Sequence, residues 1–186
     1  MSELMKFRIE ELTDVPLDTL VELEGSDFPV IVTTEGLMMF YGHPYRVSNT
    51  GGFFASAIAA TGGHTTAIVL FKEVLEKISG SSLAAVLSHE EAHLRLGHLS
   101  PGKDGTPTAN KGGILDNLQF EIEADRYSAE KHGRRTVIKA LEEMIHVTVD
   151  SVIPQKVRFR KAVVKITAWI TIHTGQIKKR RKALLA

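Results

Sequence analysis

Residues 81–97 read Ser-Ser-Leu-Ala-Ala-Val-Leu-Ser-His-Glu-Glu-Ala-His-Leu-Arg-Leu-Gly, and this stretch decides most of what the sequence predicts. It begins with hydroxyl residues that can cap a helix, continues with apolar residues at helical spacing, and ends at a glycine that can terminate a helix. The pattern therefore predicts a helix of about 15 residues.

Two histidines four residues apart lie on one face of this predicted helix. His89 and His93 are separated by about one turn, so both imidazoles can bind one metal ion. Glu90 follows the first histidine, where its carboxylate can accept a proton from a metal-bound water. The spacing H-E-x-x-H thus predicts metal-assisted hydrolysis. The alternative, two surface histidines on an ordinary polar helix, is disfavoured by the regular helix pattern and by a third candidate ligand downstream.

That third ligand lies in residues 120–127, which read Phe-Glu-Ile-Glu-Ala-Asp-Arg-Tyr on a second predicted helix ending at Gly133. A catalytic zinc site has three protein ligands and one open position. Glu121 and Asp125 share one helix face, which suits a carboxylate ligand and a second acid that supports a ligand. Glu123 points about 200° away from Glu121 and is expected to face solvent or pair with a base.

His98 is the nearest further histidine after the motif. Its spacing does not fit H-E-x-x-H-x-x-G-x-x-H, because it falls five residues after His93 and not six. We expect its side chain to lie at the C-terminal end of the helix, where positive charge is favoured.

The combination of H-E-x-x-H with E-x-x-x-D resembles the HtpX and CAAX prenyl protease family of zinc metallopeptidases, which are gluzincins. Residues 67–71, 74–75 and 81–89 are similar to that family's edge strand, short helix and active-site helix. The resemblance covers roughly residues 57–145 and suggests a small soluble member.

By position, the resemblance implies a set of site residues. His89, His93 and Glu121 would bind Zn²⁺, and Glu90 would act as the general base. Asp125 would orient one of the two histidines through a hydrogen bond.

The chain departs from the family where family members often carry Asn-Ala-Phe-Ala-Thr-Gly. Residues 57–62 read Ala-Ile-Ala-Ala-Thr-Gly, so an asparagine that can bind substrate or an oxyanion is missing. His146 is a candidate for stabilising the oxyanion by its chemistry alone, as are His173, Tyr127 and Arg126. For each of them a structural role is favoured.

Composition places the chain among ordinary globular proteins. It has 186 residues, 43% hydrophobic and 24% charged, which predicts one domain with a full-sized core. The absence of cysteine excludes disulfides, cysteine-based metal sites and a cysteine nucleophile. The charged start of the chain does not resemble a signal peptide, and no apolar stretch is long enough to span a bilayer. A cytoplasmic location is expected.

Charge is distributed unevenly. Residues 151–186 hold 10 of the 23 lysines and arginines and none of the 22 acidic residues. The run Lys178-Lys179-Arg180-Arg181-Lys182 is expected to be a solvated tail or to dock on the acidic remainder of the chain. A sharper alternative is an anionic partner, such as nucleic acid or an anionic membrane face.

We therefore expect a single α+β domain over residues 1–186, with its core at 57–145 and a basic segment at 151–186. It would contain a small N-terminal sheet with an edge strand, a zincin-like helix pair and C-terminal helices. Strands are predicted at 30–33, 37–41, 45–50 and 67–71, with a turn at 42–44 and an irregular loop, a candidate flap, at 101–113.

The predicted function is that of a zinc-dependent endopeptidase acting on a peptide or protein substrate. Two alternatives stay open: an inactive zinc-binding interaction protein, and a DNA-associated protease recruited by the basic C-terminus. The base at Glu90 favours an active enzyme over the inert binder.

Overall fold

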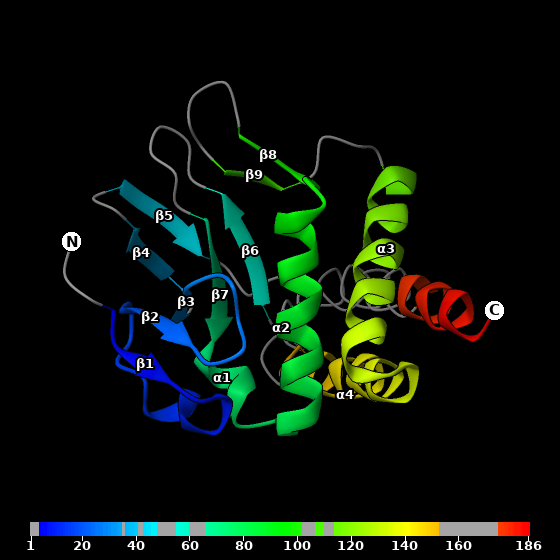
Figure 1. The fold of residues 1–186 in the computed structure, drawn as a ribbon, viewed down its shortest axis with the longest axis horizontal. Coiled ribbons are helices and arrows are strands. Elements are labelled where there is room, and N and C mark those ends of the chain that lie inside the picture. Colours follow the sequence, from blue (N-terminus) through cyan, green and yellow to red (C-terminus); the bar gives the residue numbers. More distant parts are fainter. Residues whose placement is uncertain are drawn as a thin grey trace, which may run out of the picture.

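The computed structural model describes residues 4–34, 36–40, 43–47, 55–59, 66–101, 107–109, 114–152 and 175–186. The expected α+β architecture is confirmed: a five-stranded sheet lies on one side of a long helix, and further helices lie on the other (Figure 1). Within these ranges, no helix is both long and apolar enough to cross a membrane.

The main sheet has the strand order β1 (Lys6–Phe7), β2 (Leu20–Leu23), β3 (Val30–Thr33), β7 (Thr66–Phe71) and β6 (Ala55–Ala59). The central pair, β3 and β7, is parallel, whereas β2 and β6 run antiparallel to their inner neighbours. All of β3 is buried, as are residues 67–71 of β7. Continuous apolar runs of this kind are typical of strands covered on both faces.

Residues 67–71 do form a strand, but the expectation that this strand lies at an edge of the sheet is wrong, because β7 is an interior strand. Ile68 is paired with Val30 on one side and with Ala57 on the other. Among the described residues, β6 lies at this edge of the sheet and β1 lies at the other. The apolar run of β7 belongs to the sheet centre, since an exposed edge usually carries charge or other features that prevent further pairing.

A separate two-stranded ribbon consists of β4 (Gly36–Phe40) and β5 (His43–Val47). Both predicted strands exist, but they do not join the main sheet. The expected turn at 42–44 is shorter than predicted, because His43 and Pro44 already pair with β4. Proline is tolerated there because each strand of a two-stranded ribbon has a free edge.

A second ribbon corrects the expectation of an irregular loop after the metal-binding helix. β8 (Leu99–Pro101) pairs with β9 (Pro107–Ala109) in antiparallel fashion. The two prolines of this region, Pro101 and Pro107, lie opposite each other in the ribbon.

All of the α-helices come after the strands of the main sheet in the sequence. A 3₁₀ helix, η1 (Ile9–Asp14), comes between β1 and β2; the others are α1 (Lys72–Leu75), α2 (Gly80–Arg95), α3 (Ile114–His132), α4 (Arg134–Val152) and an unlabelled helix at 175–185. The predicted short helix before the metal-binding helix is confirmed by α1. Residues 159–173, in which apolar residues recur at helical spacing, lie outside the described residues.

The ends of α2 and α3 show how local sequence sets their length. Gly97 and Gly133 follow the two helices with φ of 69° and 83°, the left-handed conformation that ends a helix at little cost for glycine. The N-cap of α2 is Ser79, and not Ser81 or Ser82 as expected. The backbone N–H and the hydroxyl of Ser79 donate to Glu143 of α4, which satisfies this helix start from a neighbouring element.

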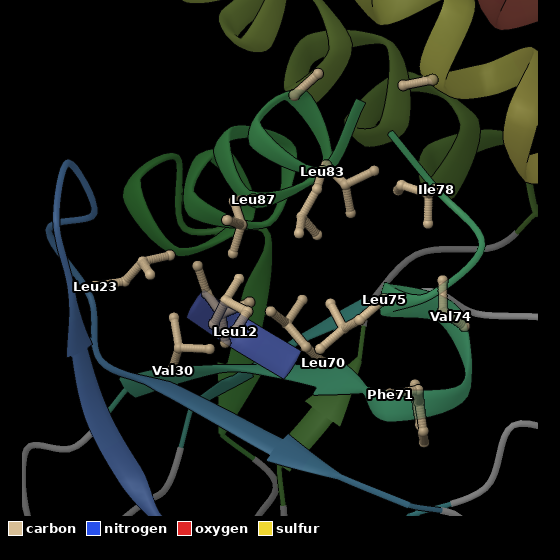
Figure 2. Packing of buried hydrophobic residues seen from close by; sticks show 14 of the residues in the cluster. Leu12, Leu23, Val30, Leu70, Phe71, Val74, Leu75, Ile78, Leu83 and Leu87 are labelled. Atoms are coloured by element: carbon tan, nitrogen blue, oxygen red, sulfur yellow. The ribbon is translucent and has the colours of Figure 1, made fainter. Parts of the chain in front are cut away.

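Apolar side chains fill the space between α2 and the sheet (Figure 2). Leu83 and Leu87 of α2 point toward Leu12, Leu70 and Leu75. Burying a leucine side chain stabilises a fold by about 1.5–3 kcal/mol, so these contacts fix the rotation of α2 about its axis. The opposite face of α2 is thereby directed toward α3.

Candidate metal centre

The two histidines of the motif lie on the face of α2 that packs against α3. Both are buried, with 8% and 5% of their surfaces exposed for His89 and His93. Their Nε2 atoms are 3.1 Å apart, and the rings meet edge to face. Burial of two imidazoles whose Nε2 atoms face each other is unusual for polar surface residues, so the alternative of two ordinary surface histidines is not supported.

Glu121 of α3 completes the group. Its Oε2 atom lies 3.3 Å from Nε2 of His89, and its Oε1 atom lies 3.4 Å from Nε2 of His93. Ligand atoms of these three residues all lie within 4.8 Å of one another, and they form the only such group among the described residues.

This donor set fits zinc. Two ligands placed 2.0–2.2 Å from a tetrahedral ion are roughly 3.4 Å apart, close to the three separations seen here. Two imidazoles and one carboxylate also leave one coordination position open, as in catalytic zinc sites. His89, His93 and Glu121 could therefore hold the ion.

The far side of the His89 ring is occupied by Asp125 and Arg180. Nδ1 of His89 lies 2.9 Å from Oδ1 of Asp125, so the Nδ1 proton is donated to that carboxylate and Nε2 is the nitrogen that faces Glu121. Arg180 donates from Nε and Nη2 to the two oxygens of Asp125, each at 2.7 Å. Its Nη1 is 2.9 Å from Oε2 of Glu121.

These contacts shift the acid–base properties of the group. Burial alone would lower the pKa of His89, but the carboxylates of Asp125 and Glu121 outweigh it and raise this pKa to about 10. Burial alone would raise the pKa of Glu121, but Arg180 and the two imidazoles hold it well below its usual value. The pKa of Asp125 is lowered as well, with burial opposed by Arg180.

Arg180 was not singled out from the sequence as a site residue. The basic run had been expected to be a solvated tail or to dock on the acidic remainder of the chain, and within the described helix 175–185 Arg180 docks. The missed signal is that Arg180 lies between Ile177 and Leu184, three and four residues away, on the apolar face of that helix. A charged residue within an apolar stripe is expected to meet a buried partner of opposite charge.

His98 and Glu123 differ from expectation. The His98 ring is only 4% exposed and contacts the ring of His93, whereas a cationic position at the helix end had been expected. Burial, and then the proximity of His93, lower its pKa, which favours a neutral ring. Glu123 does not simply face solvent: its Oε2 lies 3.2 Å from Nε2 of His98.

The remaining candidates are the proposed base Glu90 and the residues considered for oxyanion stabilisation. Glu90 is partly exposed on α2, and its charge raises the pKa of Arg180, which puts it close to the same group. His146 and Arg126 are exposed, and Tyr127 lies under the Lys131 ammonium at 5.0 Å. No described contact joins these three side chains to the metal-binding group. His173 lies outside the described residues.

The helices that carry the candidate ligands are held together by buried polar contacts. Glu91, in the middle of the motif, is 1% exposed; it accepts hydrogen bonds from the backbone of Asp27 and from Lys131 of α3, at 2.8 and 2.7 Å. Ser128 of α3 donates to the carbonyl of Ala85 at 2.8 Å. These bonds set the spacing of α2 and α3, and hence the distance from the histidines to Glu121.

Comparison with protein families gives one match: the model of peptidase family M48 matches residues 54–101. The segment is therefore similar to M48 peptidases. It contains β6, β7, α1, α2 and β8, and it includes the whole H-E-x-x-H motif. The expected resemblance to zinc metallopeptidases of the HtpX and CAAX prenyl protease type is thus confirmed at the level of the M48 family.

The M48 match ends before α3, so it does not include Glu121, Asp125 or Arg180. These three residues lie beside the matched segment only in the folded structure. Searches of curated proteins and of solved structures gave no match. Over residues 54–101 the chain is thus similar to peptidases of family M48.

Proposed function

We propose that this protein is a zinc-dependent endopeptidase that hydrolyses peptide bonds with a metal-activated water. The observation that carries the proposal is the convergence within 4.8 Å of ligand atoms of His89 and His93, on a helix inside the M48 match, and of Glu121 on α3. His89, His93 and Glu121 would hold the ion. Bound zinc would polarise the scissile carbonyl and lower the pKa of a water.

Glu90 is proposed as the general base. It would take a proton from the attacking water and deliver it to the leaving amine. Three observations support this role: Glu90 follows His89 in the sequence, it is partly exposed, and its charge raises the pKa of Arg180. A carboxylate that is open to solvent on one side can exchange its proton with substrate and water.

Asp125 has a supporting role in the proposal. By accepting the Nδ1 proton of His89, it would keep the Nε2 lone pair available for the ion. Arg180 holds the Asp125 carboxylate with two hydrogen bonds, so the orientation of this ligand depends on the C-terminal helix.

The proposed substrate is an extended peptide that lies along β6. Among the described residues, this strand is at the edge of the sheet, and it contacts α2, the helix that carries His89 and His93. A peptide can add to such an edge by main-chain hydrogen bonds. This proposal replaces the earlier assignment of the edge to residues 67–71.

The test compares the wild-type chain with Glu90→Gln. Glutamine is nearly isosteric, so zinc content and fold should persist while cleavage is lost. Zinc would be measured by elemental analysis and cleavage by mass spectrometry of products from a mixed protein substrate. Glu130→Gln, an exposed change on α3, is the matched control. Equal cleavage by Glu90→Gln and wild type would refute the role of Glu90.

A further inference from the structure

The imidazole of His98 links the second ligand histidine to a carboxylate. Nδ1 of His98 lies 3.1 Å from Nδ1 of His93, and Nε2 of His98 lies 3.2 Å from Oε2 of Glu123. The ring stacks on Phe120, with centroids 4.5 Å apart and planes 19° from parallel. Gln119 donates to the other oxygen of Glu123 at 2.7 Å, which holds this carboxylate in place.

The direction of these hydrogen bonds follows from the ligand role of His93. A neutral imidazole that offers Nε2 to a metal carries its proton on Nδ1. That proton can be donated only to the Nδ1 lone pair of His98, which then carries its own proton on Nε2. This second proton faces the Glu123 carboxylate. Each donor in the chain from His93 to Glu123 thus has one acceptor.

His98 is not placed to bind the same ion itself. It contacts the Nδ1 edge of His93, whereas Glu121 and His89 contact the Nε2 edge. The two ring nitrogens point in different directions, so His98 lies behind the ligand ring as seen from the candidate ion.

We propose that His98 and Glu123 are positioning residues that fix the orientation and the tautomer of His93 for metal binding. The inference rests on the proposed zinc site. It gives the two ligand histidines different supports: His89 donates directly to a carboxylate, and His93 reaches one through a second imidazole. Hydrogen-bond partners of metal-bound histidines typically change metal affinity by about 10- to 100-fold.

The test measures the zinc dissociation constant of the full chain by competition with a chelator, and the visible absorption of the Co²⁺-substituted protein. His98→Phe retains an aromatic ring beside Phe120 but removes the acceptor for His93. It should weaken zinc binding by about 10- to 100-fold. His98→Gln offers an amide oxygen to Nδ1 of His93 and should restore most of the affinity. Glu123→Ala should weaken binding by a smaller factor, and the exposed Glu130→Ala should have no effect.

Several results would overturn the proposal. One is wild-type zinc affinity with an unchanged Co²⁺ spectrum in His98→Phe. Equal weakening by His98→Gln and His98→Phe is another, because lost packing would then explain the effect. If His98→Phe does not fold, wild-type affinity in Glu123→Ala, a change at a partly exposed side chain, decides against the proposal. A wild-type chain that takes up no zinc refutes the proposed function itself, which distinguishes the two failures.

Discussion

The guanidinium of Arg180 holds the carboxylate of Asp125 through two hydrogen bonds of 2.7 Å, although the residues lie 55 positions apart in the chain. Both side chains are almost fully buried, with 9% and 2% exposed. Paired planar groups of this kind are among the strongest polar contacts in proteins. The C-terminal helix is therefore a structural part of the candidate metal centre.

Replacing Arg180 by methionine should destabilise the fold by about 3–5 kcal/mol, because Asp125 and Glu121 lose their common cation in a buried site. Arg181→Met is the matched control. Its guanidinium is half-exposed and 3.5 Å from Glu142, a surface contact worth less than about 1 kcal/mol. Urea unfolding of both variants checks the difference. Equal midpoints would show that the Arg180 contacts contribute little.

Glu121→Ala should weaken zinc binding by more than about 100-fold, since loss of a ligand costs more than loss of a ligand's hydrogen-bond partner. The same substitution at Glu130 should leave affinity unchanged. Chelator competition on the purified chain is the measurement. Retention of wild-type affinity in Glu121→Ala would mean that another residue supplies the third ligand.

Zinc uptake should release a proton from His89. Because the pKa of His89 is raised to about 10, the ring is protonated at pH 7 and must lose this proton to bind an ion. Affinity should then rise about tenfold per pH unit between pH 6 and 8. Calorimetry in buffers of different ionisation enthalpy counts the protons. An affinity that does not change over this range would contradict the raised pKa.

The same shift acts on the stability of the fold. Because the pKa of His89 is higher in the folded protein than in the unfolded chain, protonation of His89 stabilises the fold. This contribution is complete below the unfolded pKa of about 6.5 and is lost as the pH rises toward 10. In the presence of a chelator, the free energy of unfolding should therefore fall between these pH values. Asp125→Asn should flatten this dependence, because the amide supplies no negative charge to the His89 imidazolium.

Lys131→Met should destabilise the chain by about 3 kcal/mol, because it leaves the Glu91 carboxylate buried without its cation. Adding Glu91→Gln to this variant should recover part of the loss, since the remaining group is neutral. Chemical unfolding measures the free energy of unfolding of the two variants and of the wild type. A double variant less stable than Lys131→Met alone would show that Glu91 acts mainly through its bonds to the turn at Asp27.

The local elements of the site could be predicted because local sequence determines them. The helical spacing around His89 and His93 and the glycines at 97 and 133 were sufficient to place α2 and the end of α3. The periodicity of α3 also separated Glu121 from Glu123. In each case the physical cause lies within a few residues of its effect.

Contacts between distant segments could not be read in the same way. The pairing of β6 with β7, which moves the edge of the sheet, depends on register between strands and not on the composition of either. The partners of His98, Glu123 and Arg180 are set by how α2, α3 and the C-terminal helix pack. For Arg180 a weak signal existed, since its neighbours Ile177 and Leu184 mark an inward face.

The Arg180 contact determines when the centre can be completed during synthesis. His89 precedes Arg180 by 91 positions, and the chain must leave the ribosome as far as Arg180 before the guanidinium can reach Asp125. Until then, a nascent chain carries both histidines and Glu121 without the cation that pairs with its two carboxylates. The helix at 175–185 thus completes the site, and proteolytic loss of residues 175–186 would leave Asp125 and Glu121 without their common cation.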